Sequence, residues 1–214
     1  MRYPTNVKLL WESTEWSYKQ LKHICKYLKT TMPRNKYEEQ WNKYNNYSHK
    51  RKKTYKDTAK RARSLLYLLE KILVLLKEIE NQYQQQLDLP ARYYTNIKII
   101  RKVLKQQQEM FRTGKSVPER IVSISKSCIR PIVRGKEVKA VELGAKVNMI
   151  QFDGINFIEY LSFNAFNEGT RLVQSISYGR SLFGKITHIS ADEIYATNKS
   201  ASKTNLITAK MKNE

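Results

Sequence analysis

The sequence is poor in cysteine, glycine and proline. Its 214 residues include 2 cysteines, 7 glycines and 5 prolines. Cys25 and Cys128 lie far apart and belong to no Cys or His spacing typical of a zinc site, which argues against both a disulfide framework and a metal knuckle. This cysteine usage favours a reducing cytoplasm as the location of the protein.

The sequence also lacks a long hydrophobic run. The stretch from Met1 to Trp16 has no apolar segment typical of a signal peptide. The richest apolar stretch, Leu65–Leu76, is interrupted by Glu70 and Lys71, so it is too short and too charged to span a bilayer. We therefore expect no membrane span and no membrane partner.

Acidic residues are scarce relative to basic ones. The chain has 40 Lys and Arg against 19 Asp and Glu, a net charge of +21 at pH 7. Such an excess repels itself unless an anionic partner neutralises it, and nucleic acid is the first candidate. Residues 1–115 hold 26 of the basic residues and 10 of the acidic ones, so most of the excess lies in the first half.

Apolar residues recur at helical spacing through this first half. We predict a helix from Thr5 to about Lys29, capped by Thr5 or Asn6, a second helical region from about Asn35 to Leu87, and a third between Pro90 and Gly114. Inside the second region a seam of apolar residues alternates in steps of four and three: Leu65, Leu69, Ile72, Leu76, Ile79 and Tyr83. This heptad pattern predicts a helical hairpin or small bundle.

A run of basic residues lies inside the second helical region, opposed only by Asp57. On a helix, part of this run would form a ridge that binds DNA phosphates, with an affinity that falls steeply as salt is added. The candidate DNA contacts are Lys50, Arg51, Lys52, Lys53, Lys60, Arg61 and Arg63. The competing interpretation is a solvated helix surface.

Aromatic residues surround the same run and allow two interpretations. They are Tyr37, Trp41, Tyr44, Tyr47 and Tyr55. They could stack on bases or lie along the nucleic-acid backbone. The spacing of Tyr37, Trp41 and Tyr44 in steps of four and three favours instead the buried stripe of one helix.

Beyond Gly114 the chain changes to β-branched residues with a period near two, so we place a domain boundary after residue 115. Val141–Phe152 and Ile155–Phe163 predict an antiparallel hairpin, because Asp153-Gly154 between apolar runs favours the turn that twisted strands need. Asn167 is expected to cap a helix that runs to Phe183 and ends at Gly184.

A short strand is expected over Lys185–Ala191, with Asp192 at its end. By pattern alone, Asp192 is better interpreted as a helix N-cap than as a metal ligand, because a single carboxylate is a weak signal. Residues 199–214 are expected to be a polar, poorly ordered tail, in which Leu206-Ile207 could form a brief strand.

Several motifs in a fixed order carry a resemblance to a known family. They are Arg2-Tyr3-Pro4-Thr5, Arg120–Lys136, Val141–Val147, Leu161–Thr170 and Ala191–Tyr195. In order and spacing they are similar to bacterial insertion-sequence transposases with a DDE catalytic domain, over almost the whole stretch from residue 1 to about 198. The resemblance implies an α+β fold with an incomplete ribonuclease H-like mixed sheet over residues 116–198 and a large inserted helical region over residues 1–115.

The resemblance also makes Asp192 the second acidic residue of the catalytic triad and a ligand of Mg²⁺. In such enzymes, carboxylates hold two ions that activate the attacking oxygen and stabilise the leaving one. The family's first Asp would precede Arg2 and its Glu would lie well downstream of Asp192, and neither is recognised here. We therefore expect a fragment truncated at both ends, without strand cleavage of its own, that binds double-stranded DNA in the bacterial cytoplasm.

Four basic residues lie beside the presumed catalytic site and are weaker candidates for DNA contacts. They are Arg130, Arg134, Lys136 and Lys146. Solvated surface is the competing interpretation for each of them.

Two alternatives to the transposase hypothesis remain. The chain could be a non-catalytic helical module that binds DNA, self-associates or pairs with a full-length transposase through the heptad seam. It could also be an unstable product without a role, because an incomplete sheet exposes an unpaired edge.

Overall fold

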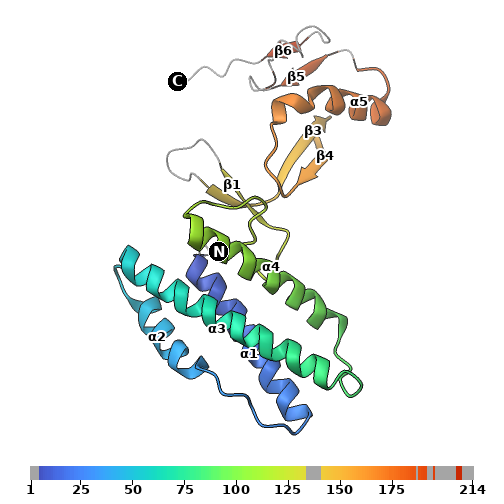
Figure 1. The fold of residues 1–214 in the computed structure, drawn as a ribbon. Helices are drawn as coiled ribbons and strands as arrows, with labels where there is room; N and C mark the ends of the chain where they lie inside the picture. Colours follow the sequence, from blue (N-terminus) through green and yellow to red (C-terminus); the bar gives the residue numbers. More distant parts are fainter. Residues whose placement is uncertain (1–4, 134–140, 187, 192–194, 196–205, 209–214) are drawn as a thin grey trace. The chain divides into compact units, whose positions relative to one another are not determined.

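The computed structural model describes residues 5–133, 141–186, 188–191, 195 and 206–208. It divides the chain into two units, a helical unit of residues 1–129 and a mixed unit of residues 130–214 (Figure 1). The helices and small sheets make the protein an α+β protein, as predicted.

The helical unit contains four helices, which are α1 (Asn6–Tyr27), α2 (Tyr37–His49), α3 (Tyr55–Gln82) and α4 (Ala91–Thr113). The predicted first helix is confirmed: the side chain of Thr5 accepts a hydrogen bond from the Lys8 amide at 3.2 Å and caps α1. The predicted end of the third helix is also confirmed. Gly114 closes α4 with φ +69°, a left-handed conformation that glycine adopts at little cost.

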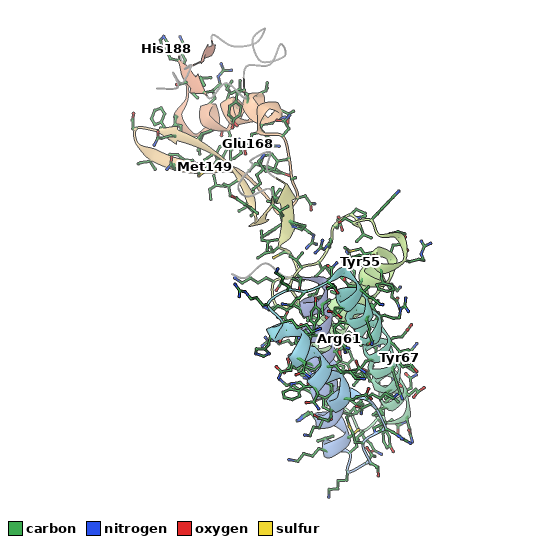
Figure 2. The ribbon with its side chains drawn as sticks, turned by 90° about the vertical axis from the view of Figure 1, so that its left-hand side faces the viewer. Tyr55, Arg61, Tyr67, Met149, Glu168 and His188 are labelled. Carbon is green, nitrogen blue, oxygen red and sulfur yellow. The ribbon has the colours of Figure 1, made fainter. Side chains whose placement is uncertain are left out.

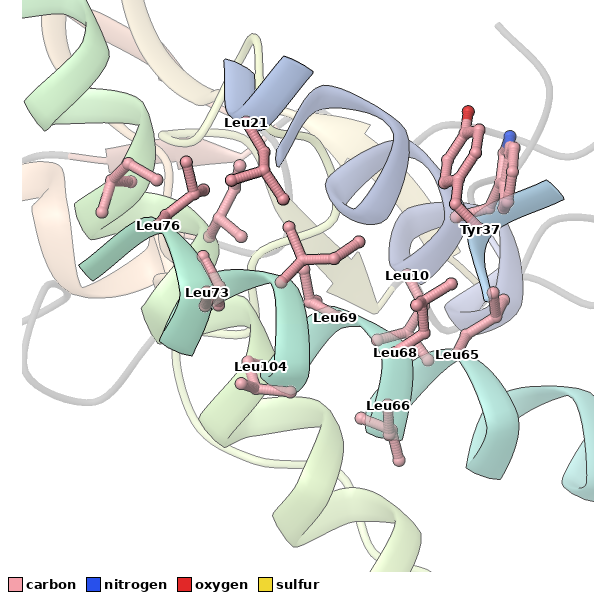
Figure 3. Packing of buried hydrophobic residues seen from close by; sticks show 14 of the residues in the cluster. Leu10, Leu21, Tyr37, Leu65, Leu66, Leu68, Leu69, Leu73, Leu76 and Leu104 are labelled. Atoms are coloured by element: carbon pink, nitrogen blue, oxygen red, sulfur yellow. The ribbon is translucent and has the colours of Figure 1, made fainter. Parts of the chain in front are cut away.

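Helix α3 packs against each of the other three helices, and its apolar seam forms the centre of the core (Figure 3). Leu65, Leu69, Ile72 and Leu76 of the seam are fully buried. They belong to one cluster with Leu10 and Leu21 of α1 and with Ile97, Ile100 and Leu104 of α4. The heptad seam is therefore used within this chain, which leaves these four side chains inaccessible to a second copy or another protein.

The second helical region consists of two helices rather than one. The backbone leaves the helical conformation at Lys50, which has φ −59° and ψ 127°. Helix α3 begins after Thr54, whose side chain accepts a hydrogen bond from the Asp57 amide at 3.0 Å. The run Lys50–Lys53 therefore lies in a link between helices, because an N-cap at Thr54 restarts the helix and four adjacent cations do not favour its continuation.

The segment of residues 116–129 belongs to the helical unit. Ile121 is buried in a small cluster with Leu9 of α1 and Val103 of α4. Its amide donates a hydrogen bond to Oε1 of Gln106 at 3.0 Å. The two units are therefore divided after Ile129, whereas the change in residue type along the sequence lies near residue 115. Within the described residues, no helix is both long and apolar enough to span a bilayer.

The mixed unit holds strands paired two by two. They are β1 (Arg130–Val133) antiparallel to β2 (Val141–Gly144), β3 (Lys146–Phe152) antiparallel to β4 (Ile155–Ser162), and β5 (Ile189–Ala191) parallel to β6 (Leu206–Thr208). The 3₁₀ turn η1 (Glu168–Arg171) and helix α5 (Leu172–Phe183) lie between β4 and β5 in the chain. Strand β6 coincides with the brief strand predicted at Leu206-Ile207.

The predicted helix is confirmed as α5, and the predicted hairpin is confirmed for Lys146–Phe152 and Ile155–Ser162. Val141–Gly144, expected to belong to the first strand of this hairpin, instead forms β2 and pairs with β1. Asp153 and Gly154 turn the chain between β3 and β4 with φ of 48° and 80°, the two positive values that a tight two-residue turn requires. The side chain of Asn167 accepts a hydrogen bond from the Gly169 amide at 3.0 Å and caps η1, and Gly184 ends α5. Helix α5 approaches β3 closely, since a Cβ on Gly179 would lie 3.5 Å from Cδ1 of Ile150.

Candidate nucleic-acid interface

The excess positive charge is concentrated in the helical unit. Residues 1–129 include 28 Lys and Arg against 11 Asp and Glu, a balance of +17. Residues 130–214 include 12 against 8, a balance of +4. A polyanion would therefore be attracted to the helical unit far more strongly than to the mixed unit.

Six exposed cations surround the start of α3, and we call them the basic segment: Lys50, Arg51, Lys52, Lys53, Lys56 and Lys60. The link holds a defined shape, because Nζ of Lys53 donates a hydrogen bond to the carbonyl oxygen of Lys50 at 3.0 Å and lies 5.5 Å from the centre of the Tyr47 ring. Arg51, Lys52, Lys56 and Lys60 form no ion pair with any described residue. Four charges are thus available to an anionic ligand.

Asp57 is the acidic residue of this region, and it is already paired. Its Oδ2 accepts a hydrogen bond from Nζ of Lys50 at 3.1 Å. This hydrogen bond, together with the charge of Lys50, holds the pKa of the Asp57 carboxyl below its usual value. Asp57 therefore stays ionised and offsets chiefly Lys50, with a smaller interaction with Lys60, and it leaves most of the positive charge of the basic segment uncompensated.

Arg61 and Arg63 have different environments, although both are predicted DNA contacts. Arg61 is only 8% exposed, and its Nη1 donates a hydrogen bond to Oε1 of the buried Gln40 at 2.8 Å. Burial also lowers the pKa of the Arg61 guanidinium. Because Arg61 lies in the core and its guanidinium is already hydrogen-bonded, it is a weaker candidate for a DNA contact than the exposed cations around it.

The position of Arg61 could have been recognised in the sequence. It lies four residues before Leu65, so it extends the buried seam by one helical turn. Arg63 lies on the solvent face instead, and its Cζ is 5.7 Å from the centre of the Phe111 ring. Figure 2 labels Arg61. Arg63 thus remains a candidate for DNA binding.

Lys146 of the mixed unit is engaged within its own unit. Its Nζ donates a hydrogen bond to the carbonyl oxygen of Phe166 at 2.7 Å and lies 3.1 Å from a carboxylate oxygen of Glu168. Arg130 is half-buried at the start of β1, opposite Gly144. Arg134 and Lys136 lie outside the described residues. The mixed unit therefore offers less support for DNA contacts than the helical unit does.

Asp192, the predicted metal ligand, also lies outside the described residues. The strand before it is described and ends at Ala191, which pairs with Thr208 of β6. Among the residues that the structure describes, no group of three or more His, Cys, Asp or Glu side chains could hold a metal ion.

The aromatic residues near the basic segment divide into a packed and an exposed set. The ring of Tyr37 stacks on Tyr18 and Trp11 at centroid distances of 3.6 and 5.4 Å, and Tyr44 stacks on Trp11 at 4.7 Å. The buried-stripe interpretation is therefore confirmed for these two tyrosines. Trp41, in contrast, is 44% exposed, and Tyr55 at the start of α3 is 91% exposed (Figure 2).

A buried polar network in the mixed unit was not predicted. Asn148 of β3 donates hydrogen bonds from Nδ2 to Glu159 of β4 and to Ser175 of α5, and its Oδ1 accepts one from the Tyr195 hydroxyl, each at 2.8 Å. Arg171 forms an ion pair with Glu159. Asn148 thereby connects both strands of the hairpin, α5 and the short segment that follows β5.

The same network sets the protonation of Glu159. Burial raises the pKa of its carboxyl, but hydrogen bonds from Arg171 and Asn148 outweigh burial, so the pKa lies below its usual value. A polar Asn within an otherwise apolar strand is the signal in the sequence that could have indicated this network, but such a signal does not identify partners far away in the chain.

A groove of about 720 Å³ lies between α1, α4 and residues 122–127 of the helical unit. Two of its lysines are paired with glutamates of the same helix: Lys8 lies 3.6 Å from Glu12 and Lys19 lies 2.8 Å from Glu15. Its lining carries both signs of charge, so it is less suited to a polyanion than the basic segment.

Comparison of the chain with protein-family models, with curated proteins and with solved structures finds no significant match.

Proposed function

We propose that the protein acts on DNA in a DDE-type transposition system, and that its helical unit binds the phosphate backbone of double-stranded DNA. The observation that carries the DNA-binding part is the basic segment, where Arg51, Lys52, Lys56 and Lys60 are exposed and make no ion pair within the described residues. Asp57 forms its ion pair with Lys50 rather than with any of these four cations, although its charge also interacts with that of Lys60.

Phosphate contacts of this kind give affinity without sequence recognition. Each lysine or arginine that neutralises a phosphate releases a condensed counterion, so the affinity falls linearly with the logarithm of the salt concentration. The start of α3 adds to the attraction, because the N-terminus of a helix carries a partial positive charge. The basic segment is therefore proposed to hold the DNA backbone rather than to read bases.

The transposase part of the proposal comes from the sequence motifs. Its support in the structure is the order of hairpin β3–β4, helix α5 and strand β5, which is the order that the resemblance implies. We propose that Asp192, one residue beyond β5, is a ligand of Mg²⁺ in an incomplete ribonuclease H-like core. The ion would polarise a phosphodiester and activate the attacking oxygen in an intact site.

The DNA-binding part is tested by fluorescence anisotropy with a labelled duplex over a range of NaCl concentrations. In Arg51→Ala/Lys52→Ala/Lys56→Ala, we expect weaker binding and a salt slope that is shallower by up to about 2.7, since each lost phosphate contact removes about 0.9 from the slope. The control replaces three exposed lysines elsewhere in the helical unit, Lys22→Ala/Lys26→Ala/Lys77→Ala, and removes the same net charge. Equal losses in the two triple variants would contradict a localised interface.

A further inference from the structure

Besides Trp41 and Tyr55, two further exposed aromatic rings of the helical unit lie beside cations, one on α3 and one on the neighbouring helix α4. Tyr67 of α3 is 69% exposed and Phe111 of α4 is 38% exposed (Figure 2 labels Tyr67). Arg63 is close to both rings. It lies one turn before Tyr67 on α3, and its guanidinium approaches the centre of the Phe111 ring at 5.7 Å. We call Arg63, Tyr67 and Phe111 the aromatic platform.

Cations continue along α3 on both sides of Tyr67. Lys56, Lys60, Arg63, Tyr67 and Lys71 recur in steps of three or four and are all exposed. This stripe covers about 22 Å at a rise of 1.5 Å per residue. Neither Lys60 nor Lys71 forms an ion pair with a described residue. A strand of nucleic acid that follows the stripe would meet a positive charge before and after the platform.

We infer that the aromatic platform stacks on unpaired bases of a single-stranded nucleic acid, whose phosphates contact Lys60, Arg63 and Lys71. The inference rests on the proposed function and adds a second substrate form to it. The bases of a duplex are stacked on one another in its interior, so exposed rings gain little from a duplex backbone. Every unpaired base offers a face to an aromatic side chain, and neighbouring cations hold the backbone in place.

The environment of Tyr67 fits a ligand platform better than a structural role. Its hydroxyl makes no hydrogen bond and its ring meets no other ring among the described residues, whereas Tyr18 and Tyr37 are packed in the core. Within two turns of the ring the exposed cations Lys60, Arg63 and Lys71 outnumber the exposed Glu70, a balance that favours a polyanion over an apolar protein surface.

The test compares a labelled single-stranded oligonucleotide without self-complementarity and the duplex of the same sequence, using full-length protein in fluorescence anisotropy. In Tyr67→Ala/Phe111→Ala, we expect single-strand affinity to fall at least about fivefold for each ring that stacks on a base, with duplex affinity changed less than about twofold. Tyr67→Phe keeps the ring and is expected to bind like the wild type. Tyr27→Ala, at an exposed tyrosine of α1, is the matched control.

Photocrosslinking of a bromouracil-substituted strand gives an independent readout, with adducts expected on Tyr67 or Phe111. Unchanged single-strand affinity in the double variant, or an equal loss for strand and duplex, would overturn the inference and leave duplex binding intact. If Tyr67→Ala/Phe111→Ala leaves single-strand affinity unchanged but abolishes the binding of another protein, the inference would be overturned in favour of a protein-docking surface. Failure of the wild type to bind either oligonucleotide would remove the proposed function as well.

Discussion

Arg61 of α3 donates a hydrogen bond from Nη1 to Oε1 of Gln40 in α2, at 2.8 Å, and both side chains are buried. This is a charged group in the core whose partner is a neutral amide. Desolvation of the guanidinium is therefore compensated by the hydrogen bond and by the packing of its aliphatic stem rather than by an ion pair. Arg61 fixes α2 against α3 next to the basic segment.

Replacement of Arg61 is expected to destabilise the fold. Arg61→Ala removes the packed stem and leaves the amide oxygen of Gln40 without its donor, so the free energy of unfolding should fall by about 2–3 kcal/mol. Arg63→Ala is the matched control, since it removes an exposed arginine two residues away and should change stability by less than about 0.5 kcal/mol. Urea denaturation followed by circular dichroism measures both, and equal effects would contradict the buried role of Arg61.

The stability of the helical unit should depend on alkaline pH through Tyr37. Burial, followed by the charges of Glu15 and Glu38, raises the pKa of the Tyr37 hydroxyl to about 12. Since the value in an unfolded chain is about 10, the resulting stabilisation is complete below about pH 10 and is lost as pH rises through about 12. We expect the free energy of unfolding to fall less steeply over this range in Tyr37→Phe than in the wild type.

Tyr27→Phe provides the comparison for this pH series, because Tyr27 lies on the surface of α1. Its alkaline profile should coincide with that of the wild type. A Tyr37→Phe profile that also coincides with the wild type would show that Tyr37 does not contribute to the alkaline loss of stability.

Asn148 is expected to contribute strongly to the stability of the mixed unit. Asn148→Ala takes one donor from the buried carboxylate of Glu159 and removes the acceptor of the Tyr195 hydroxyl, so a loss of about 2–3 kcal/mol is expected. Hydrogen exchange of the β3 and β4 amides measures this loss in the mixed unit itself. Asn156→Ala, at an exposed position of β4, should have little effect.

The same variant should change the response to acid. The folded pKa of Glu159 lies below its unfolded value near 4.3, so its stabilisation is present above that value and is lost as pH falls through the folded pKa. Asn148→Ala removes a hydrogen bond that lowers the folded pKa, so the gap between the folded and unfolded pKa narrows, and the free energy of unfolding should fall less on acidification than it does in the wild type. An acid profile identical to that of the wild type would contradict this assignment.

The role proposed for Asp192 is tested by nicking of supercoiled plasmid in Mg²⁺. We expect no nicking by this chain alone, because the motifs that carry the resemblance supply one carboxylate and two-metal chemistry needs several. Asp192→Asn should leave duplex affinity unchanged or slightly higher, since it removes a negative charge. Nicking by the wild type that disappears in Asp192→Asn would contradict the expectation.

Local patterns accounted for most of the elements in the structure. The seam of α3, the cap at Thr5 and the turn at Asp153-Gly154 each follow from residues close together in the sequence, because periodicity and turn chemistry act over short distances. The division between α2 and α3 was missed for a related reason. The basic residues around Lys50 are compatible with a helix surface as well as with a loop. They lie in a loop because the N-cap at Thr54 starts a new helix after them.

The candidate site was less predictable than the helices. The sequence located the basic segment, and the four-residue spacing of Arg61 from Leu65 indicated its buried side, but the pattern could not show that Gln40 of α2 is its hydrogen-bond partner, because that depends on where α2 crosses α3. The contact of Arg63 with Phe111 joins residues far apart in the chain. Such pairings arise from the tertiary packing of α3 on α4, which no local pattern encodes.

The position of Ile121 against Leu9 and Val103 determines where the chain can be shortened. A polypeptide that stops at residue 115 would lack Ile121. Leu9 of α1 and Val103 of α4 would then be exposed to water, which favours aggregation. One that stops at Ile129 would keep Ile121 packed against Leu9 and Val103 and should resist proteolysis better than the shorter polypeptide.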